Sequence, residues 1–153
     1  MEVETAALRA VSEQAPRVAG QMDPQAVSNA LYAIAKLAEK GVEVDMAALR
    51  AVSEQAPQVA GKMNPQNVSN TLYAIAKLAK KGVEVDAAAL RAVSEQAPRV
   101  AGEMNPQNVS NSLWAIAKLS LADSPLLGVK AVESTFPPKS PYSTLDRPTS
   151  DGC

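Results

Sequence analysis

The sequence predicts an all-α fold, an α-solenoid of about three 41-residue helical-hairpin repeats with a disordered C-terminal tail. Two observations indicate it. One nine-residue block recurs without change at a step of 41 residues, over 8–16, 49–57 and 90–98. A second block recurs with few changes at the same step, over 24–37, 65–78 and 106–119. A fixed period of this length is typical of arrays in which each unit buries its apolar face against its neighbour.

Each repeat begins with a predicted helix, here taken from the middle repeat, 42–82. Asp45 is a suitable N-cap, because its carboxylate can accept hydrogen bonds from the free amides of the first turn. Apolar residues then follow at helical spacing on one face: Leu49, Val52, Ala56, Val59 and Met63. Pro57 removes an amide donor and disfavours helical geometry at the preceding residue, so we expect this helix to be kinked or broken at the proline.

A second predicted helix follows with clear start and stop signals. Asn64 is the expected N-cap and Pro65 takes the first helical position, where a missing amide costs nothing. Lys80 and Lys81 suit the negative end of the helix dipole, and Gly82 is a suitable C-cap residue. The expected core stripe is Val68, Leu72, Ile75, Ala76 and Ala79. The starts equivalent to Asn64-Pro65 are Asp23-Pro24 and Asn105-Pro106.

The period divides the chain into four parts. Repeats 1, 2 and 3 are expected over 1–41, 42–82 and 83–120. After Leu119 the pattern ends and the sequence becomes rich in proline and serine. We therefore expect 121–153 to be a mostly disordered tail, with one short helix over 122–132 that caps the array.

Composition argues against catalysis. The chain has no histidine, and Cys153 is its single cysteine, so a zinc site or an internal disulfide is not expected. Gly-rich phosphate loops and nucleophile motifs are also missing. We expect no enzymatic activity, no cofactor, no metal site and no small-molecule substrate.

Two features of the sequence bear on location. The chain lacks an apolar run long enough to cross a membrane, and its acidic start, Met1-Glu2-Val3-Glu4, is unlike a signal peptide or a transit peptide. An intracellular, reducing compartment is the default expectation, with the compartment itself left open.

One face of the second helix is the predicted binding surface. At 100° per residue the side opposite the apolar stripe carries amide, aromatic and ammonium groups in every repeat. Lysine can neutralise phosphate, an aromatic ring can stack on an unpaired base, and amides can bond base edges. The candidate residues are Gln25, Asn29, Tyr32, Lys36, Gln66, Asn70, Tyr73, Lys77, Gln107, Asn111, Trp114 and Lys118.

Each of these residues also has a structural interpretation. Tyr73, at the border of the apolar face, can pack on the next repeat, Asn70 can hold the repeat spacing, and Lys77 can be an ordinary solvated residue. Positions that differ between repeats are candidates for sequence reading, or have drifted at tolerant sites. They are Gln21, Lys62 and Glu103, and also Ala30, Thr71 and Ser112.

The segment 63–78, Met-Asn-Pro-Gln-Asn-Val-Ser-Asn-Thr-Leu-Tyr-Ala-Ile-Ala-Lys-Leu, resembles the second helix of octotricopeptide-type repeats. The segment 111–117 around Trp114 is especially similar to that pattern. This resemblance covers about 120 residues and implies RNA binding of the kind found in organellar RNA-processing and RNA-editing proteins, which makes an organelle one possible location. The period is also similar to that of SKWP-type bacterial effectors, which look like armadillo or HEAT arrays, although no SKWP tetrapeptide follows Lys77.

Two hypotheses for function follow. The favoured one is single-stranded RNA binding. In it the asparagines contact bases or sugars, the lysines contact phosphates and the aromatic rings stack on bases. At about one base per repeat, the chain would bind about three nucleotides. The alternative is a scaffold for an extended peptide or protein, which the net charge of −1 favours. The middle repeat alone is basic, with five basic against three acidic residues. A fragment of a longer array, or a chain without a present function, also fits the abrupt end of the repeats.

Overall fold

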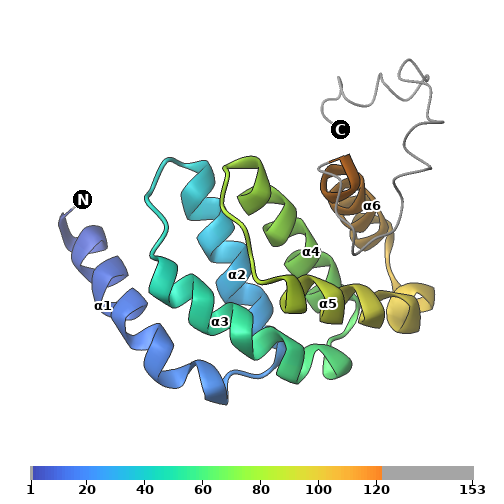
Figure 1. Cartoon of the computed structure of the whole chain (residues 1–153), viewed down its shortest axis with the longest axis horizontal. Helices are drawn as coiled ribbons and strands as arrows, with labels where there is room; N and C mark the ends of the chain where they lie inside the picture. The colour runs from blue at the N-terminus through green and yellow to red at the C-terminus, as the bar shows by residue number, and fades with distance from the viewer. Residues whose placement is uncertain (1, 122–153) are drawn as a thin grey trace. The chain divides into compact units, whose positions relative to one another are not determined.

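The computed structural model describes residues 2–121, and within them every regular element is helical. The elements in order are α1 (Glu2–Val18), η1 (Ala19–Gln21), α2 (Pro24–Glu39), α3 (Met46–Val59), η2 (Ala60–Lys62), α4 (Pro65–Lys80), α5 (Ala87–Val100), η3 (Ala101–Glu103) and α6 (Pro106–Leu121), where η marks a short 3-10 helix. The all-α prediction is confirmed over this range (Figure 1). The tail and capping helix expected after residue 121 lie outside the described residues.

Contacts between residues divide the chain into two units, Met1–Lys118 and Leu119–Cys153. The first unit holds all the helices except the last turn of α6. The expected repeats place α1 and α2 in the first, α3 and α4 in the second, and α5 and α6 in the third. Each repeat thus contributes an α-helix, a 3-10 turn and a second α-helix.

The predicted helix starts are present. The Asp23 carboxylate accepts from the backbone amide of Ala26 at 2.8 Å, and Asp45 accepts from Ala48 at 3.1 Å. Asn64 and Asn67 exchange hydrogen bonds, each side chain accepting from the other's backbone amide. This reciprocal cap satisfies two amides that would otherwise lack partners.

Helices α2 and α4 each end shortly before a glycine, Gly41 and Gly82. Gly82 has a φ of +82°, in the left-handed region where a side chain would be strained. Its amide donates to Ala79 O, and the amide of Val83 donates to Leu78 O, both at 2.9 Å. This is the Schellman arrangement, and Gly41, with a φ of +88°, ends α2 in the same way.

The break expected at the prolines is not present. Helix α3 continues through Pro57 to Val59 and only then tightens into η2. Pro16 and Pro98 lie at the same place inside α1 and α5. The proline removes only its own amide bond to residue i−4, and the buried side chains of Ala56 and Val59 on either side of it stabilise the helix by packing.

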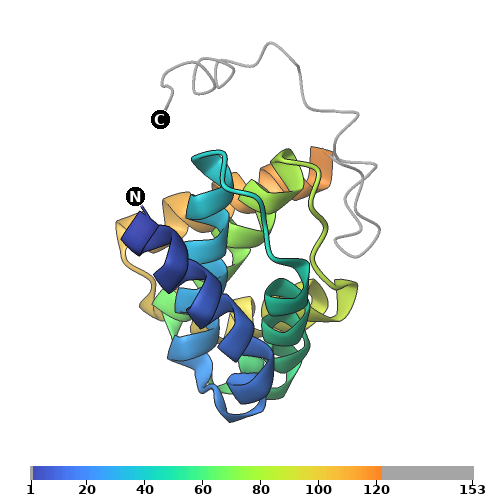
Figure 2. The same ribbon diagram turned by 90° about the vertical axis from the view of Figure 1, so that its left-hand side faces the viewer.

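The core lies between repeats. Helix α3 contacts both α1 and α5, α2 contacts both α3 and α4, and α4 contacts α5. Figures 1 and 2 show α1, α3 and α5 side by side, with α2 and α4 behind them. The two predicted apolar stripes of the middle repeat are buried, except that Ala79 is only half-buried.

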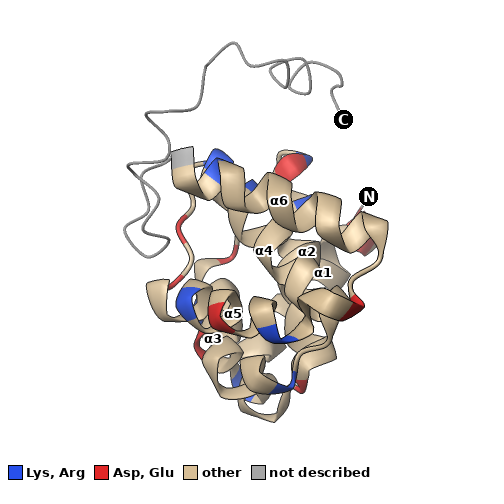
Figure 3. Cartoon of the chain, turned by 90° about the vertical axis from the view of Figure 1, so that its right-hand side faces the viewer, with Lys and Arg blue, Asp and Glu red and all other residues tan. Residues whose placement is uncertain are grey.

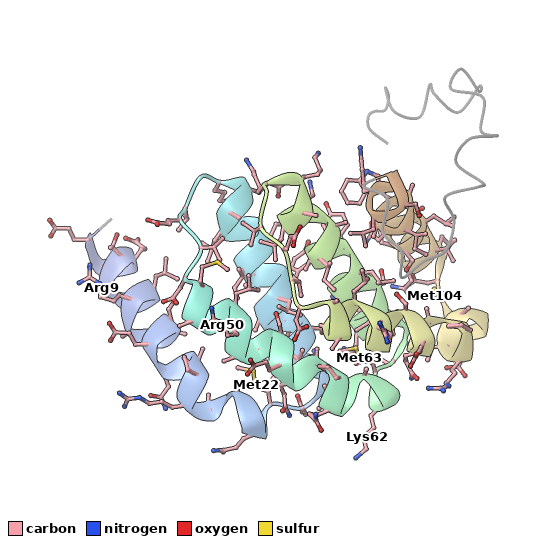
Figure 4. The ribbon with its side chains drawn as sticks, in the orientation of Figure 1. Arg9, Met22, Arg50, Lys62, Met63 and Met104 are labelled. Atoms are coloured by element: carbon pink, nitrogen blue, oxygen red, sulfur yellow. The ribbon has the colours of Figure 1, made fainter. Side chains whose placement is uncertain are left out.

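Side-chain amides fasten one repeat to the next. Gln55 donates to Met22 O at 3.0 Å, and Gln96 donates to Met63 O at 2.9 Å. The acceptors, Met22 and Met63, occupy equivalent positions directly after η1 and η2 and are labelled in Figure 4. Both joints between repeats therefore use the same hydrogen bond.

Candidate functional site

Three aromatic rings from successive repeats lie next to one another. The centroids of Tyr32 and Tyr73 are 6.0 Å apart with planes tilted by 31°, and those of Tyr73 and Trp114 are 5.2 Å apart with a tilt of 42°. All three side chains are half-buried. These residues form a continuous strip, here termed the aromatic row, that joins α2, α4 and α6. The packing of Tyr73 on its neighbours agrees with the structural interpretation given above.

Lysine ammonium groups lie over these rings. Lys36 Nζ is 5.5 Å from the centroid of Tyr32, and Lys77 Nζ is 5.4 Å from the centroids of both Tyr73 and Trp114. A cation held over an aromatic face is stabilised by the ring quadrupole, by about 0.5–1 kcal/mol at exposed sites. The rings and the lysines predicted as site residues are thus brought together.

Trp114 gathers the most positive charge. Besides Lys77, it has Lys80 Nζ at 5.8 Å and Lys118 Nζ at 5.7 Å from its centroid. Lys118 was a predicted site residue, whereas Lys80 was assigned only to the helix dipole. Three ammonium groups therefore lie within 5.8 Å of the centroid of one ring, an arrangement that suits an anion.

Glu39 places a negative charge beside Lys36 and Lys77, the second of which also lies over Trp114. Its carboxylate forms an ion pair with Lys77 from the next repeat, and a second with Lys36 at 3.6 Å. The hydrogen bond from Lys77 lowers the pKa of Glu39. For Lys77, partial desolvation alone would lower the pKa, but the hydrogen bond and charge of Glu39 outweigh it and the pKa is raised. Both groups are therefore charged at neutral pH.

Glu39 and Lys80 occupy the same place in successive repeats, 41 residues apart. The joint between repeats 1 and 2 therefore carries a carboxylate where the joint between repeats 2 and 3 carries an ammonium group. As a result, positive charge along the aromatic row increases from Tyr32 toward Trp114. The sequence contains the signal for this asymmetry, a reversal of charge at one repeat position.

The predicted amide side chains differ from repeat to repeat in their exposure and their hydrogen bonds. Gln25, Asn29 and Gln66 are exposed, and Asn70 is half-buried. In repeat 3 the predicted pair meets, since Gln107 donates to Asn111 at 3.1 Å.

The positions that vary between repeats fall into two groups. Gln21, Lys62 and Glu103 are exposed on the 3-10 turns, and Figure 4 shows the Lys62 side chain pointing away from the helices. Thr71 and Ser112 are buried. A ligand on the surface cannot contact a buried hydroxyl, so these two positions do not read a sequence.

Sequence reasoning missed the polar contacts between repeats. Asn67 Nδ2 donates to the buried hydroxyl of Ser28 at 3.3 Å, in addition to its capping role. The glutamine bonds from Gln55 and Gln96 were also missed. A pattern along one chain does not reveal which side chains meet across a joint, and hence these residues looked like ordinary polar positions.

Within residues 2–121, no cluster of side chains suits a metal ion, and none of the helices has the length and apolar character needed to cross a membrane. Comparison of the chain with protein-family models, with curated proteins and with solved structures found no match.

Proposed function

We propose that this chain is a non-catalytic α-solenoid of octotricopeptide-like repeats that binds single-stranded RNA along the aromatic row. The observation that carries the proposal is the locus at Trp114, where Lys77, Lys80 and Lys118 lie 5.4–5.8 Å from the ring centroid. An ammonium cluster beside an aromatic surface suits a nucleotide, because it offers a partner to both the phosphate and the base.

The ring spacing specifies how bases would bind. Inserting a base between two rings needs a centroid separation of roughly 7 Å, twice the roughly 3.4 Å rise between stacked bases. The rings are 5.2 and 6.0 Å apart and tilted, so they leave no slot. Bases would therefore lie on the outer surface of the row, with their phosphates toward the lysines.

The charge gradient supports an expectation of where binding is strongest. The carboxylate of Glu39 neutralises part of the charge of Lys36 and Lys77, whereas Lys80 and Lys118 add positive charge at Trp114. We expect phosphate to concentrate at the Trp114 end. A net charge of −1 for the whole chain is compatible with this, because phosphate contacts depend on the local field.

Repetition of the joints supports the solenoid arrangement. Equivalent helices meet in both joints, α1 with α3 and α3 with α5, and the same glutamine bond closes each joint. Similar joints in succession turn each repeat by a similar amount, which produces a superhelix. Each repeat would then contribute one ring and at least one lysine to a continuous surface.

The test is a fluorescence-anisotropy titration of the full chain with short single-stranded RNAs at two salt concentrations. A variant with Lys77, Lys80 and Lys118 changed to alanine is compared with wild type. We expect wild-type binding to weaken at higher salt, and the variant to lose both most of its affinity and most of its salt dependence.

A matched control removes the same charge elsewhere. Arg9, Arg50 and Arg91 occupy equivalent positions in α1, α3 and α5, outside the aromatic row, and Figure 4 labels the first two. Changing these three to alanine should leave RNA affinity within about twofold, since exposed charges beyond a Debye length of about 10 Å are largely screened. Equal losses in both variants would indicate nonspecific attraction and would overturn the assignment of the site.

An extended acidic peptide is the alternative ligand for the same lysines. If the folded chain binds no RNA at low salt but binds a fluorescent acidic peptide in a Lys77-dependent way, the RNA proposal is wrong and the scaffold hypothesis replaces it. Circular dichroism of each variant confirms that helicity is retained, so a loss of binding reports on the site.

A further inference from the structure

Helix α6 exposes apolar residues that its repeat equivalents bury. Val109 and Leu113 are 41% and 62% exposed, whereas the same positions one repeat earlier, Val68 and Leu72, are 0% and 1% exposed. Ala117 is likewise exposed. We term Val109, Leu113 and Ala117 the α6 end face. Because the equivalent residues of repeats 1 and 2 are buried and each of these repeats is followed by another, we infer that this face lies against the following repeat there.

Helix α1 shows the complementary pattern. Val11 is 68% exposed, whereas its equivalents Val52 and Val93 are 1% and 0% exposed. Ala7 and Gln14 are exposed too, although the residues equivalent to Ala7 are buried. We term Ala7, Val11 and Gln14 the α1 end face. Because the residues equivalent to Ala7 and Val11 are buried in repeats 2 and 3, where α3 contacts α1 and α5 contacts α3, we infer that this face lies against the preceding repeat there.

The molecule already shows what covers each face. Inside the chain, α2 is covered by α3 and α4, and α4 contacts α5 of the following repeat. The segment 8–16, within α1, is identical to the corresponding segments of α3 and α5. A second copy of the chain therefore carries at its α1 end face the same residues that cover the equivalent surface within the chain.

We propose that the α6 end face binds the α1 end face of a second copy, head to tail, in the geometry of the internal joints. Leu113 and Val109 would then be covered as Leu72 and Val68 are. Apolar burial provides the main stabilisation. Charge does not oppose the contact, because α6 is uncharged apart from Lys118 (Figure 3).

A hydrogen bond fixes the register of this contact. In the internal joints Gln55 donates to Met22 O and Gln96 donates to Met63 O. The next member of the series is Gln14 of one copy and Met104 O of the other. The joint between repeats 1 and 2 has one further hydrogen bond, from Asn67 to Ser28. The proposed contact lacks this bond, because the residue equivalent to Asn67 in repeat 1 is Ala26.

The proposed contact is heterologous, because the two faces differ. Such a contact leaves one free face of each kind on every dimer, so association continues to linear oligomers unless the array closes into a ring. It also aligns Trp114 of one copy with Tyr32 of the next. Successive copies would therefore present one uninterrupted aromatic row.

Sedimentation velocity of the full chain, at protein concentrations from micromolar to millimolar, tests the inference. Wild type is compared with two variants, each of which blocks one end face. Leu113→Glu blocks only the α6 end face, and Val11→Glu blocks only the α1 end face. A buried unpaired charge should weaken the joint by about a hundredfold or more. Both residues are exposed, so the variants should keep wild-type helicity by circular dichroism.

Mixing the two variants gives the sharpest readout. Each should be monomeric alone, but the intact α6 end face of Val11→Glu can bind the intact α1 end face of Leu113→Glu. The mixture should form 1:1 dimers and no larger species. Met46→Glu, an exposed substitution in the middle repeat, should associate as wild type does.

Three results would overturn the proposal. A full chain that stays monomeric throughout the range shows that the faces do not pair. Association abolished by Leu113→Glu but unaffected by Val11→Glu shows a symmetric contact instead. Association that neither variant weakens places the contact elsewhere on the molecule.

Discussion

The second and third repeats have nearly the same sequence in their second helices, yet equivalent residues meet different surroundings. Leu72 in α4 is completely buried, while Leu113 in α6 is among the most exposed apolar residues described. Lys77 is paired with Glu39 from the repeat before it, while Lys118 has Trp114 beside it and Lys80 in the equivalent place to Glu39. The local sequence specifies the helix, and the neighbouring repeat specifies what each of its faces does.

The same lesson applies to the first helices. Val52 and Val93 belong to the core, whereas Val11, within an identical nine-residue segment, is exposed. Burial in this fold is therefore a property of the joint. Substituting equivalent positions in different repeats separates the contribution of the joint from that of the residue itself.

The largest contrast is expected between Leu72→Ala and Leu113→Ala. Removing the buried side chain leaves a cavity and should lower the free energy of unfolding by about 2–5 kcal/mol. The exposed equivalent should change it by no more than about 0.5 kcal/mol. Urea denaturation in dilute solution measures both. Similar losses would mean that α6 is packed as tightly as α4.

The next contrast concerns the two ends of the aromatic row. Trp114→Ala should weaken RNA binding by about 1–3 kcal/mol, since it removes a stacking surface. Tyr32→Ala should have a smaller effect, because Glu39 reduces the local attraction for phosphate there. Anisotropy titrations at one fixed salt concentration compare the variants. A larger loss for Tyr32→Ala would reverse the proposed gradient.

A smaller difference is expected between Gln96→Ala and Gln14→Ala. The Gln96 side chain is buried and satisfies Met63 O, so its removal leaves an unpaired carbonyl and should cost about 1–3 kcal/mol of stability. Gln14 is exposed, and its removal should leave stability within about 0.5 kcal/mol. Thermal unfolding of dilute samples distinguishes them. Equal destabilisation would show that the glutamine acts inside its own helix.

The smallest effect is expected at Glu39. Glu39→Gln should change stability by about 1 kcal/mol or less, since the ion pair is partly exposed, and should raise RNA affinity a few-fold by freeing Lys77. The folded state lowers the pKa of Glu39. Its contribution to stability is therefore present above the ordinary glutamate pKa and is lost as pH falls through the lowered value. Denaturation at several pH values should show a weaker dependence in Glu39→Gln than in wild type, since Glu4, whose pKa is also lowered, remains.

Much of the fold could be predicted because its signals are local. A cap such as Asp45, a proline at the first helical position and a glycine after the last turn each act within a few residues, and all occur as expected. Of the two outcomes expected at Pro57, a kink or a break, the break does not occur, because the packing of the residues around a proline is not visible in a local pattern. Apolar spacing predicted the core stripes for the same local reason.

The candidate site could be predicted only in part. Helical projection placed Tyr73 and Lys77 on one side of their helix, but the contacts among the three rings depend on the distance between repeats. The roles of Glu39 and Lys80 were missed because each acts on a helix of the next repeat. Partners across a joint depend on register, which a single sequence does not encode in any local pattern.

The glutamine bond that recurs in both joints has a consequence for how such a chain can evolve. Its donor and acceptor lie in neighbouring 41-residue units, Gln96 with Met63 and Gln55 with Met22. Unequal crossing-over between two nearly identical gene segments adds or removes one whole unit. Every joint in the altered protein still pairs a glutamine donor with its carbonyl acceptor, and the aromatic row gains or loses one ring. A change of array length by whole units would therefore keep the glutamine bond at each joint.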